Sequence, residues 1–225
     1  MTDVQLEGGH TSNGQGVPVG RVRLVLLARA LERRADALRT RLGPAVSTAV
    51  EPPGSEAFAV GSASALRAGD RLFAPDRYLS AHLARGLEPD DFLARRLGGR
   101  GRPGDEREPG SAGWVSSGTE LIDLAAGAAL ALRLRDDADL VSMALVPGDA
   151  YASGRCDRAL RAGASRGLAI VLMVEAPAGL QARDPAPEVA DSADVDAVFN
   201  AAAAAVASAR AGFGPQTVLC RRGSV

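Results

Sequence analysis

The chain has 225 residues, 46% of them hydrophobic, which is enough apolar material to bury one substantial core or two small ones. Its formal net charge of -1 gives no electrostatic reason to expect nucleic acid or an anionic membrane as a partner, and because all 26 basic residues are Arg, a Lys Schiff base is excluded. No apolar run is long enough to span a bilayer and the chain does not open with a signal-peptide pattern, so we expect a cytoplasmic protein.

Residues 1–20 are polar and Gly-rich, and we expect a flexible tail there, followed by a single domain at 21–225. Within that domain, several segments carry apolar or small residues at helical spacing. The predicted helices lie at 21–42, 55–67, 76–85, 89–97, 119–134 and 195–210. Loops are predicted at 98–113 and 177–191, where Gly, Pro and charged residues follow one another without periodicity, and a short strand is predicted at 217–220.

The most informative stretch lies between Val141 and Glu175, which reads as strand, turn, helix and strand. The first strand ends at Gly148-Asp149, in the turn Pro-Gly-Asp-Ala-Tyr-Ala-Ser-Gly. In open α/β folds ligands bind at this carboxyl edge of the sheet, and an acidic side chain there suits a cation that in turn holds phosphates. The alternative role for Asp149 is a helix cap or turn residue without any metal.

The order of these elements predicts one α/β domain with a mainly parallel sheet and helices on both faces. The two cysteines are too few for a disulfide framework and do not form a cluster with metal-ligand spacing. We therefore expect Cys156 and Cys220 to be isolated buried thiols.

Stretches distributed over most of the domain correspond, in order, to the motifs of one known family. They are Gly54-Ser-Glu-Ala57, Asp76-Arg77 followed by Leu-Ala-Arg-Gly at 83–86, the Ala-rich helix that ends at Leu134, Val-Pro-Gly-Asp-Ala at 146–150, and the segment 195–222. With these stretches the chain resembles the alpha subunit of thiamine-pyrophosphate-dependent 2-oxo acid dehydrogenases of the pyruvate dehydrogenase type. The resemblance implies the thiamine-diphosphate-binding fold.

The resemblance also implies a site. In the family, the diphosphate is held through a divalent cation by the Asp of a Gly-Asp-Gly turn, while an Arg contacts phosphate directly. Carried over, Asp149 would be the Mg²⁺ ligand and Arg77 the phosphate contact, with the turn residues Gly148, Ala150 and Tyr151 as the cradle of thiamine pyrophosphate. For Arg77, the alternative is an ordinary surface or interface ion pair.

The chain departs from the family at several of these positions. Ala150 replaces the second Gly of the turn, Pro177 replaces the Asn that supplies the second metal ligand, and Asp76 replaces the Tyr before the Arg. The loop at 98–113 lacks the family's histidine. Glu175 would be either a substitute metal ligand or a solvated loop residue, and Tyr151 would fill space that the cofactor occupies in relatives.

Two hypotheses about function follow. The first is the alpha-type subunit of a two-component enzyme, which decarboxylates a 2-oxo acid and transfers the acyl or aldehyde unit with thiamine pyrophosphate and Mg²⁺. The second is a homologue without cofactor, which serves as a structural partner or repurposed pocket for a beta-type subunit. Both imply a heterodimer or heterotetramer with that subunit, no nucleic acid and no membrane. We expect the small-residue helices at 55–67 and 119–134 to be exposed packing faces for the partner.

Overall fold

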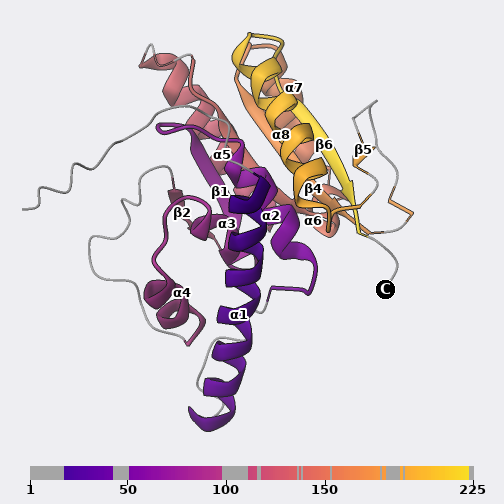
Figure 1. The fold of residues 1–225 in the computed structure, drawn as a ribbon. Coiled ribbons are helices and arrows are strands. Elements are labelled where there is room, and N and C mark those ends of the chain that lie inside the picture. Colours follow the sequence, from indigo (N-terminus) through magenta and orange to yellow (C-terminus); the bar gives the residue numbers. More distant parts are fainter. Residues whose placement is uncertain are drawn as a thin grey trace, which may run out of the picture.

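A computed structural model describes residues 18–42, 51–97, 111–115, 118–135, 137, 139–152, 154–177, 179–180, 188–189 and 191–222. Its elements are α1 (Pro18–Leu42), α2 (Ser55–Ser64), β1 (Arg71–Pro75), the 3-10 helix η1 (Asp76–Tyr78), α3 (Leu79–Leu83), α4 (Pro89–Arg96), β2 (Ser111–Val115), α5 (Gly118–Leu134), β3 (Ser142–Pro147), α6 (Gly148–Ala152), α7 (Arg155–Ala164), β4 (Ile170–Ala176), β5 (Glu188–Val189), α8 (Val195–Arg210) and β6 (Gln216–Arg221). Figure 1 shows their arrangement.

The strands form one six-stranded sheet in the order β2-β1-β3-β4-β6-β5, and every neighbouring pair is parallel. The register places Pro147 in β3 beside Glu175 in β4, and Glu175 beside Cys220 in β6. Strands β3 and β4 are buried along their whole length, as expected for near-continuous apolar runs in a parallel sheet that is covered on both faces. The predicted α/β class with a parallel sheet is confirmed.

Helices cover both faces of this sheet, as predicted. Met143 and Leu145 point to one face, where they share a buried cluster with residues of α2 and α8. Ala144 and Val146 alternate to the other face and pack with residues of α5, α6 and α7. The period-2 alternation of the strand thus divides the core into two layers.

Helix α8 occupies the predicted residues, because Asp194 caps it by accepting hydrogen bonds from the backbone N–H groups of Asp196 and Ala197. Helix α2 packs so closely on α8 that a Cβ on Gly61 would lie 2.8 Å from the carbonyl oxygen of Val195. Residues 55–63 are all buried within the chain. The prediction that this helix is an exposed packing face for a partner was therefore wrong.

Strands β1 and β2 were not predicted. The prediction of a loop at 98–113 was wrong for residues 111–113, which belong to β2, whereas 98–110 lie outside the described residues. The two residues of β5 likewise lie within the predicted loop at 177–191. Each of these strands has five residues or fewer, so hydrophobic periodicity gives almost no signal, and it is pairing with the neighbouring strand that defines them.

Cys156 and Cys220 are buried and neither forms a disulfide, as predicted. Helix α1 begins at Pro18, inside the predicted tail at 1–20, and residues 1–17 lie outside the described residues. Among the helices of the described ranges, none combines the length and the apolar character that a membrane span requires.

Candidate functional site

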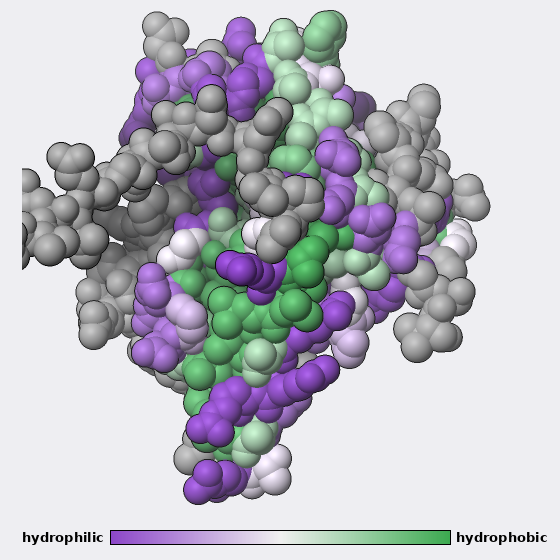
Figure 2. Space-filling model, viewed as in Figure 1, coloured by the Kyte–Doolittle hydropathy of each residue, from purple (hydrophilic) through white to green (hydrophobic). Residues whose placement is uncertain are grey.

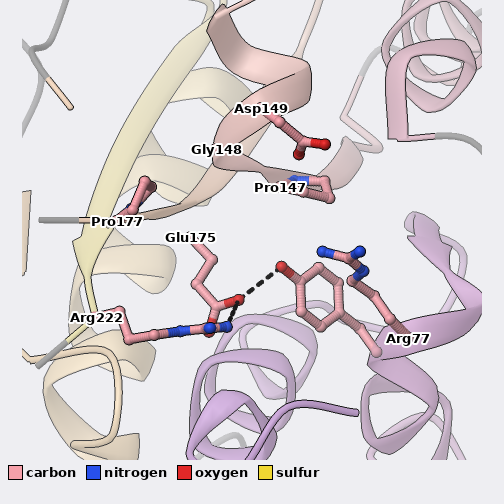
Figure 3. A pocket seen from close by; sticks show the side chains of 8 residues that line it. Arg77, Pro147, Gly148, Asp149, Glu175, Pro177 and Arg222 are labelled. Carbon is pink, nitrogen blue, oxygen red and sulfur yellow. Dashed lines mark hydrogen bonds and ion pairs between the residues drawn. The ribbon is translucent and has the colours of Figure 1, made fainter. Parts of the chain in front are cut away.

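A pocket with a volume of about 180 Å³ opens at the carboxyl edge of the sheet (Figure 3). Its walls come from segments that follow or end β1, β3, β4 and β6. The lining residues are Arg77, Tyr78, Pro147, Gly148, Asp149, Glu175, Pro177 and Arg222. The sheet thus gathers residues that are far apart in the sequence at one edge.

The pocket lies where the connections of two neighbouring strands part. After β1 the chain continues into η1 and α3 on the face that α2 and α8 cover, whereas after β3 it continues into α6 and α7 on the opposite face. The two departing connections leave a crevice outside the strand ends. Such switch points are the usual ligand sites of open α/β sheets, so the location itself argues for binding.

Glu175 is the most heavily engaged side chain of the pocket. Its Oε1 accepts a hydrogen bond from the Ser55 hydroxyl at 2.6 Å, and its Oε2 accepts from the Tyr78 hydroxyl and the Arg222 guanidinium, both at 2.8 Å. The same Arg222 nitrogen also donates to the Ser55 Oγ at 2.9 Å. Three of the roughly four acceptor positions of the carboxylate are therefore occupied. Glu175 is buried, so the expectation of a solvated loop residue was wrong.

Two groups near Glu175, the Tyr78 phenol and the Cys220 thiol, are kept in their neutral forms. Burial and then the Glu175 carboxylate raise the pKa of Tyr78 above its ordinary value, so the phenol stays protonated and donates. Burial and the same carboxylate raise the pKa of the Cys220 thiol to about 12. Cys220 is therefore an unreactive core residue at neutral pH.

Three of the residues expected in a cofactor site, Arg77, Gly148 and Asp149, line this one pocket. Asp149 is exposed and lies inside the first turn of α6, so it is not the cap residue of that helix. Neither Arg77 nor Asp149 has a hydrogen-bonding or ion-pair partner within the described part of the chain. The described residues therefore give no support to the alternative of an ordinary ion pair for Arg77.

The other two expected residues are oriented differently. Ala150 and Tyr151 are buried in the cluster beneath α5, with 4% and 3% of their surface exposed, and neither lines the pocket. The short helix α6 thus presents Asp149 to the pocket and its next two side chains to the core. Their predicted contact with a cofactor stays a prediction.

Gly148 is required by close packing. A Cβ there would lie 2.4 Å from Cδ of Pro177 and 3.1 Å from the carbonyl oxygen of Glu175. The Pro177 ring therefore lies directly against the turn that follows β3. Proline brings no N–H to this place, so it offers no hydrogen bond to a phosphate.

The donor set does not fit a diphosphate held by Mg²⁺. Mg²⁺ prefers near-octahedral oxygen ligands, and Asp149 is the pocket carboxylate that accepts no hydrogen bond from the residues that the structure describes. The other carboxylate, Glu175, lies 2.8 Å from the Arg222 guanidinium, whose positive charge would oppose a divalent cation. Among the described residues, no group of three His, Cys, Asp or Glu side chains is placed to hold a metal ion.

A second cavity of about 360 Å³ lies between α1 and the segment that precedes α2. Two of its buried carboxylates lie beside arginines of the same chain, since Arg96 is 2.6 Å from Glu32 and Arg29 is 3.4 Å from Glu56. The third, Glu51, accepts hydrogen bonds from Ser80. Because these charges are compensated internally, the cavity makes a weaker case for ligand binding than the pocket at the sheet edge.

No protein-family model matches this chain, and no curated protein matches it either. The assignment of a function therefore depends on the geometry and charge of the pocket.

Proposed function

We propose that this chain is a cytoplasmic alpha-type subunit of a two-component assembly, in which the pocket at the carboxyl edge binds a small anionic group without a resident metal. One observation carries this proposal: Glu175 is already bound to Ser55, Tyr78 and Arg222. This pairing engages the carboxylate that a metal would need and holds the Arg222 guanidinium at the wall of the pocket. The alpha-type assignment itself comes from the resemblance of the sequence.

The two arginines supply the attraction for an anion. Arg77 has no partner among the described residues, and Arg222 uses one nitrogen of its planar guanidinium for Glu175 and Ser55. Guanidinium groups match phosphate and carboxylate oxygens with paired donors, so two of them at one pocket favour an anionic ligand.

Calorimetric titration with inorganic phosphate and diphosphate, in EDTA and again in Mg²⁺, tests this proposal. We expect saturable binding that is the same in both buffers, and Arg77→Gln to weaken it about tenfold, since a charge-assisted hydrogen bond contributes about 1.5–3 kcal/mol. Arg158→Gln, which removes an exposed arginine outside the pocket, is the matched control and should change nothing. No binding of either anion in either buffer would reject the proposal.

A second candidate is the alpha-type subunit of a thiamine-pyrophosphate-dependent enzyme that acts on a 2-oxo acid. The meeting of Arg77, Gly148 and Asp149 in one pocket favours it. In this role Asp149 would hold Mg²⁺ and Arg77 a phosphate. Titration of thiamine pyrophosphate into the chain co-purified with a beta-type partner separates the two candidates. Binding that requires Mg²⁺ and is lost in Asp149→Ala supports the thiamine-pyrophosphate enzyme. Binding of phosphate without Mg²⁺ supports the metal-free anion site.

Apolar side chains on two helices support the existence of a partner. Figure 2 shows an apolar area over α1, where Val22 and Leu26 are 44% and 57% exposed. On α5, Leu124, Leu130 and Leu134 are 45%, 38% and 78% exposed. Exposed apolar side chains that gather on one helix face are typical of protein interfaces.

Gly127 provides a test of the α5 face. A Cβ at this position would meet no atom within 4 Å, so Gly127→Leu should not disturb the chain alone and should stabilise it by about 0.5–1 kcal/mol through its better helix propensity. The added side chain should prevent assembly with the beta-type partner, which gel filtration would show as loss of the complex. Gly127→Ala is the control that adds a single methyl group. An unchanged elution volume of the Leu variant with its partner would count against α5 as the interface.

A further inference from the structure

Two opposite charges, Arg77 and Asp149, line the pocket without a partner among the described residues. Arg77 and Asp149 are both exposed, and neither makes a hydrogen bond or ion pair within the described residues. No nitrogen of Arg77 lies within 4.0 Å of an oxygen of Asp149, so the two are too far apart to neutralise each other. Figure 3 shows them on opposite sides of the space, Asp149 from the segment after β3 and Arg77 from the segment after β1.

The remaining charges of the pocket cancel. Arg222 and Glu175 form an ion pair at 2.8 Å, which leaves Arg77 and Asp149 as the charges that a ligand would meet. A plain anion on Arg77 would bring its negative charge towards Asp149, and a plain cation on Asp149 would bring its positive charge towards Arg77. A molecule with both charges would satisfy both side chains and avoid either repulsion.

We propose that this pocket binds a small zwitterion of the amino-acid class. The ligand's carboxylate lies against Arg77, with the guanidinium of Arg222 nearby, and its ammonium group lies against Asp149. This inference rests on the proposed function, since the same arginines attract the anionic end, and it adds that Asp149 selects a ligand that also carries a cation.

The size and the walls of the pocket indicate which amino acids are the expected ligands. A volume of about 180 Å³ is below the range of about 300–1,000 Å³ that is usual for sites of drug-sized ligands. The rings of Pro147 and Pro177 form apolar walls between the charged groups. A short amino acid with a small or absent side chain is the expected ligand.

The probes are chosen to separate the two charges. Glycine, alanine and β-alanine carry both, acetate carries the anion alone and methylamine the cation alone. Binding of each to the full chain is followed by titration calorimetry or by ligand-observed NMR at one ionic strength. We expect at least one of the amino acids to bind about tenfold or more tightly than either acetate or methylamine, since one charge-assisted contact is worth about 1.5–3 kcal/mol.

Variants assign each end of the ligand. Asp149→Asn should remove the preference for the amino acid over acetate, by weakening amino-acid binding and by relieving the repulsion that acetate meets, whereas Arg77→Gln should weaken the binding of both. Both positions are exposed, so thermal unfolding should be unaltered and loss of binding can be read as a change in the site. Equal binding of acetate and the amino acids, with no effect of Asp149→Asn, would overturn the zwitterion and leave the anion proposal standing. Binding of none of the probes, together with failure of phosphate and diphosphate, would overturn both.

Discussion

Replacing Glu175 with alanine is expected to lower the free energy of unfolding by about 3 kcal/mol, because two buried hydroxyl donors lose their acceptor and each costs about 1–3 kcal/mol. The donors are Ser55 and Tyr78, which approach the carboxylate at 2.6 and 2.8 Å. Arg222 is partly exposed, so its guanidinium can form hydrogen bonds with water once Glu175 is removed. Its contribution to the loss of stability is therefore smaller. Urea unfolding followed by circular dichroism measures the change.

Two further variants make this prediction specific. Glu175→Gln keeps one acceptor oxygen in the same shape and should cost about 1 kcal/mol, the net value of a typical hydrogen bond. Asp149→Asn alters a neighbouring carboxylate that has no partner among the described residues, and should stay within about 0.5 kcal/mol of the parent. If Glu175→Ala were no more destabilising than Asp149→Asn, the carboxylate would not be the structural centre of the pocket.

Long periodic segments allowed the main layers of the fold to be predicted from sequence. Helix α8 and the strand–helix–strand unit from β3 to β4 lie where the pattern placed them, because their apolar spacing, caps and length agree. Strand β1 was missed since Arg-Leu-Phe-Ala-Pro is too short to show a period. Its identity as a strand depends on pairing with β3, which is a contact between distant parts of the chain.

The pocket was predicted only in part, because it too depends on contacts between distant parts of the chain. Arg77, Gly148 and Asp149 were found because they sit in recognisable motifs at strand ends. Arg222 carried a weaker signal: it follows the last predicted strand, and only the strand order brings that strand beside β4. Ser55 came within a motif, but its bond to Glu175 spans 120 residues and no local pattern predicts it.

A second buried carboxylate should govern how stability depends on pH. Glu51 is 3% exposed and accepts hydrogen bonds from the backbone N–H and the hydroxyl of Ser80, and the Arg96 guanidinium lies 3.8 Å away. Burial raises its pKa to about 8, since those contacts do not compensate for the loss of water. The folded protein therefore holds a proton on Glu51 at neutral pH that the unfolded chain releases.

The sign of the effect follows from this difference. Below a pH of about 4.5, Glu51 carries its proton in both the folded and the unfolded state, and its contribution to stability is complete. As the pH rises from there to about 8, only the folded state keeps the proton. The free energy of unfolding then falls by up to about 1.4 kcal/mol per pH unit. His82 acts in the opposite sense, because burial and then the neighbouring arginines lower its pKa to about 3, so its contribution changes only below pH 6.5. The window from pH 6.5 to 8 therefore separates the effect of Glu51 from that of His82.

Glu51→Gln should flatten the fall of the unfolding midpoint across that window and should exceed the parent in stability at pH 8. The amide is neutral at every pH, has the shape of the protonated acid and still accepts from the Ser80 N–H. Glu88→Gln, which removes an exposed carboxylate, is the control and should leave the slope unchanged. A steep slope that survives Glu51→Gln would mean that Glu51 is ionised in the folded chain, with Arg96 drawn close enough to stabilise it.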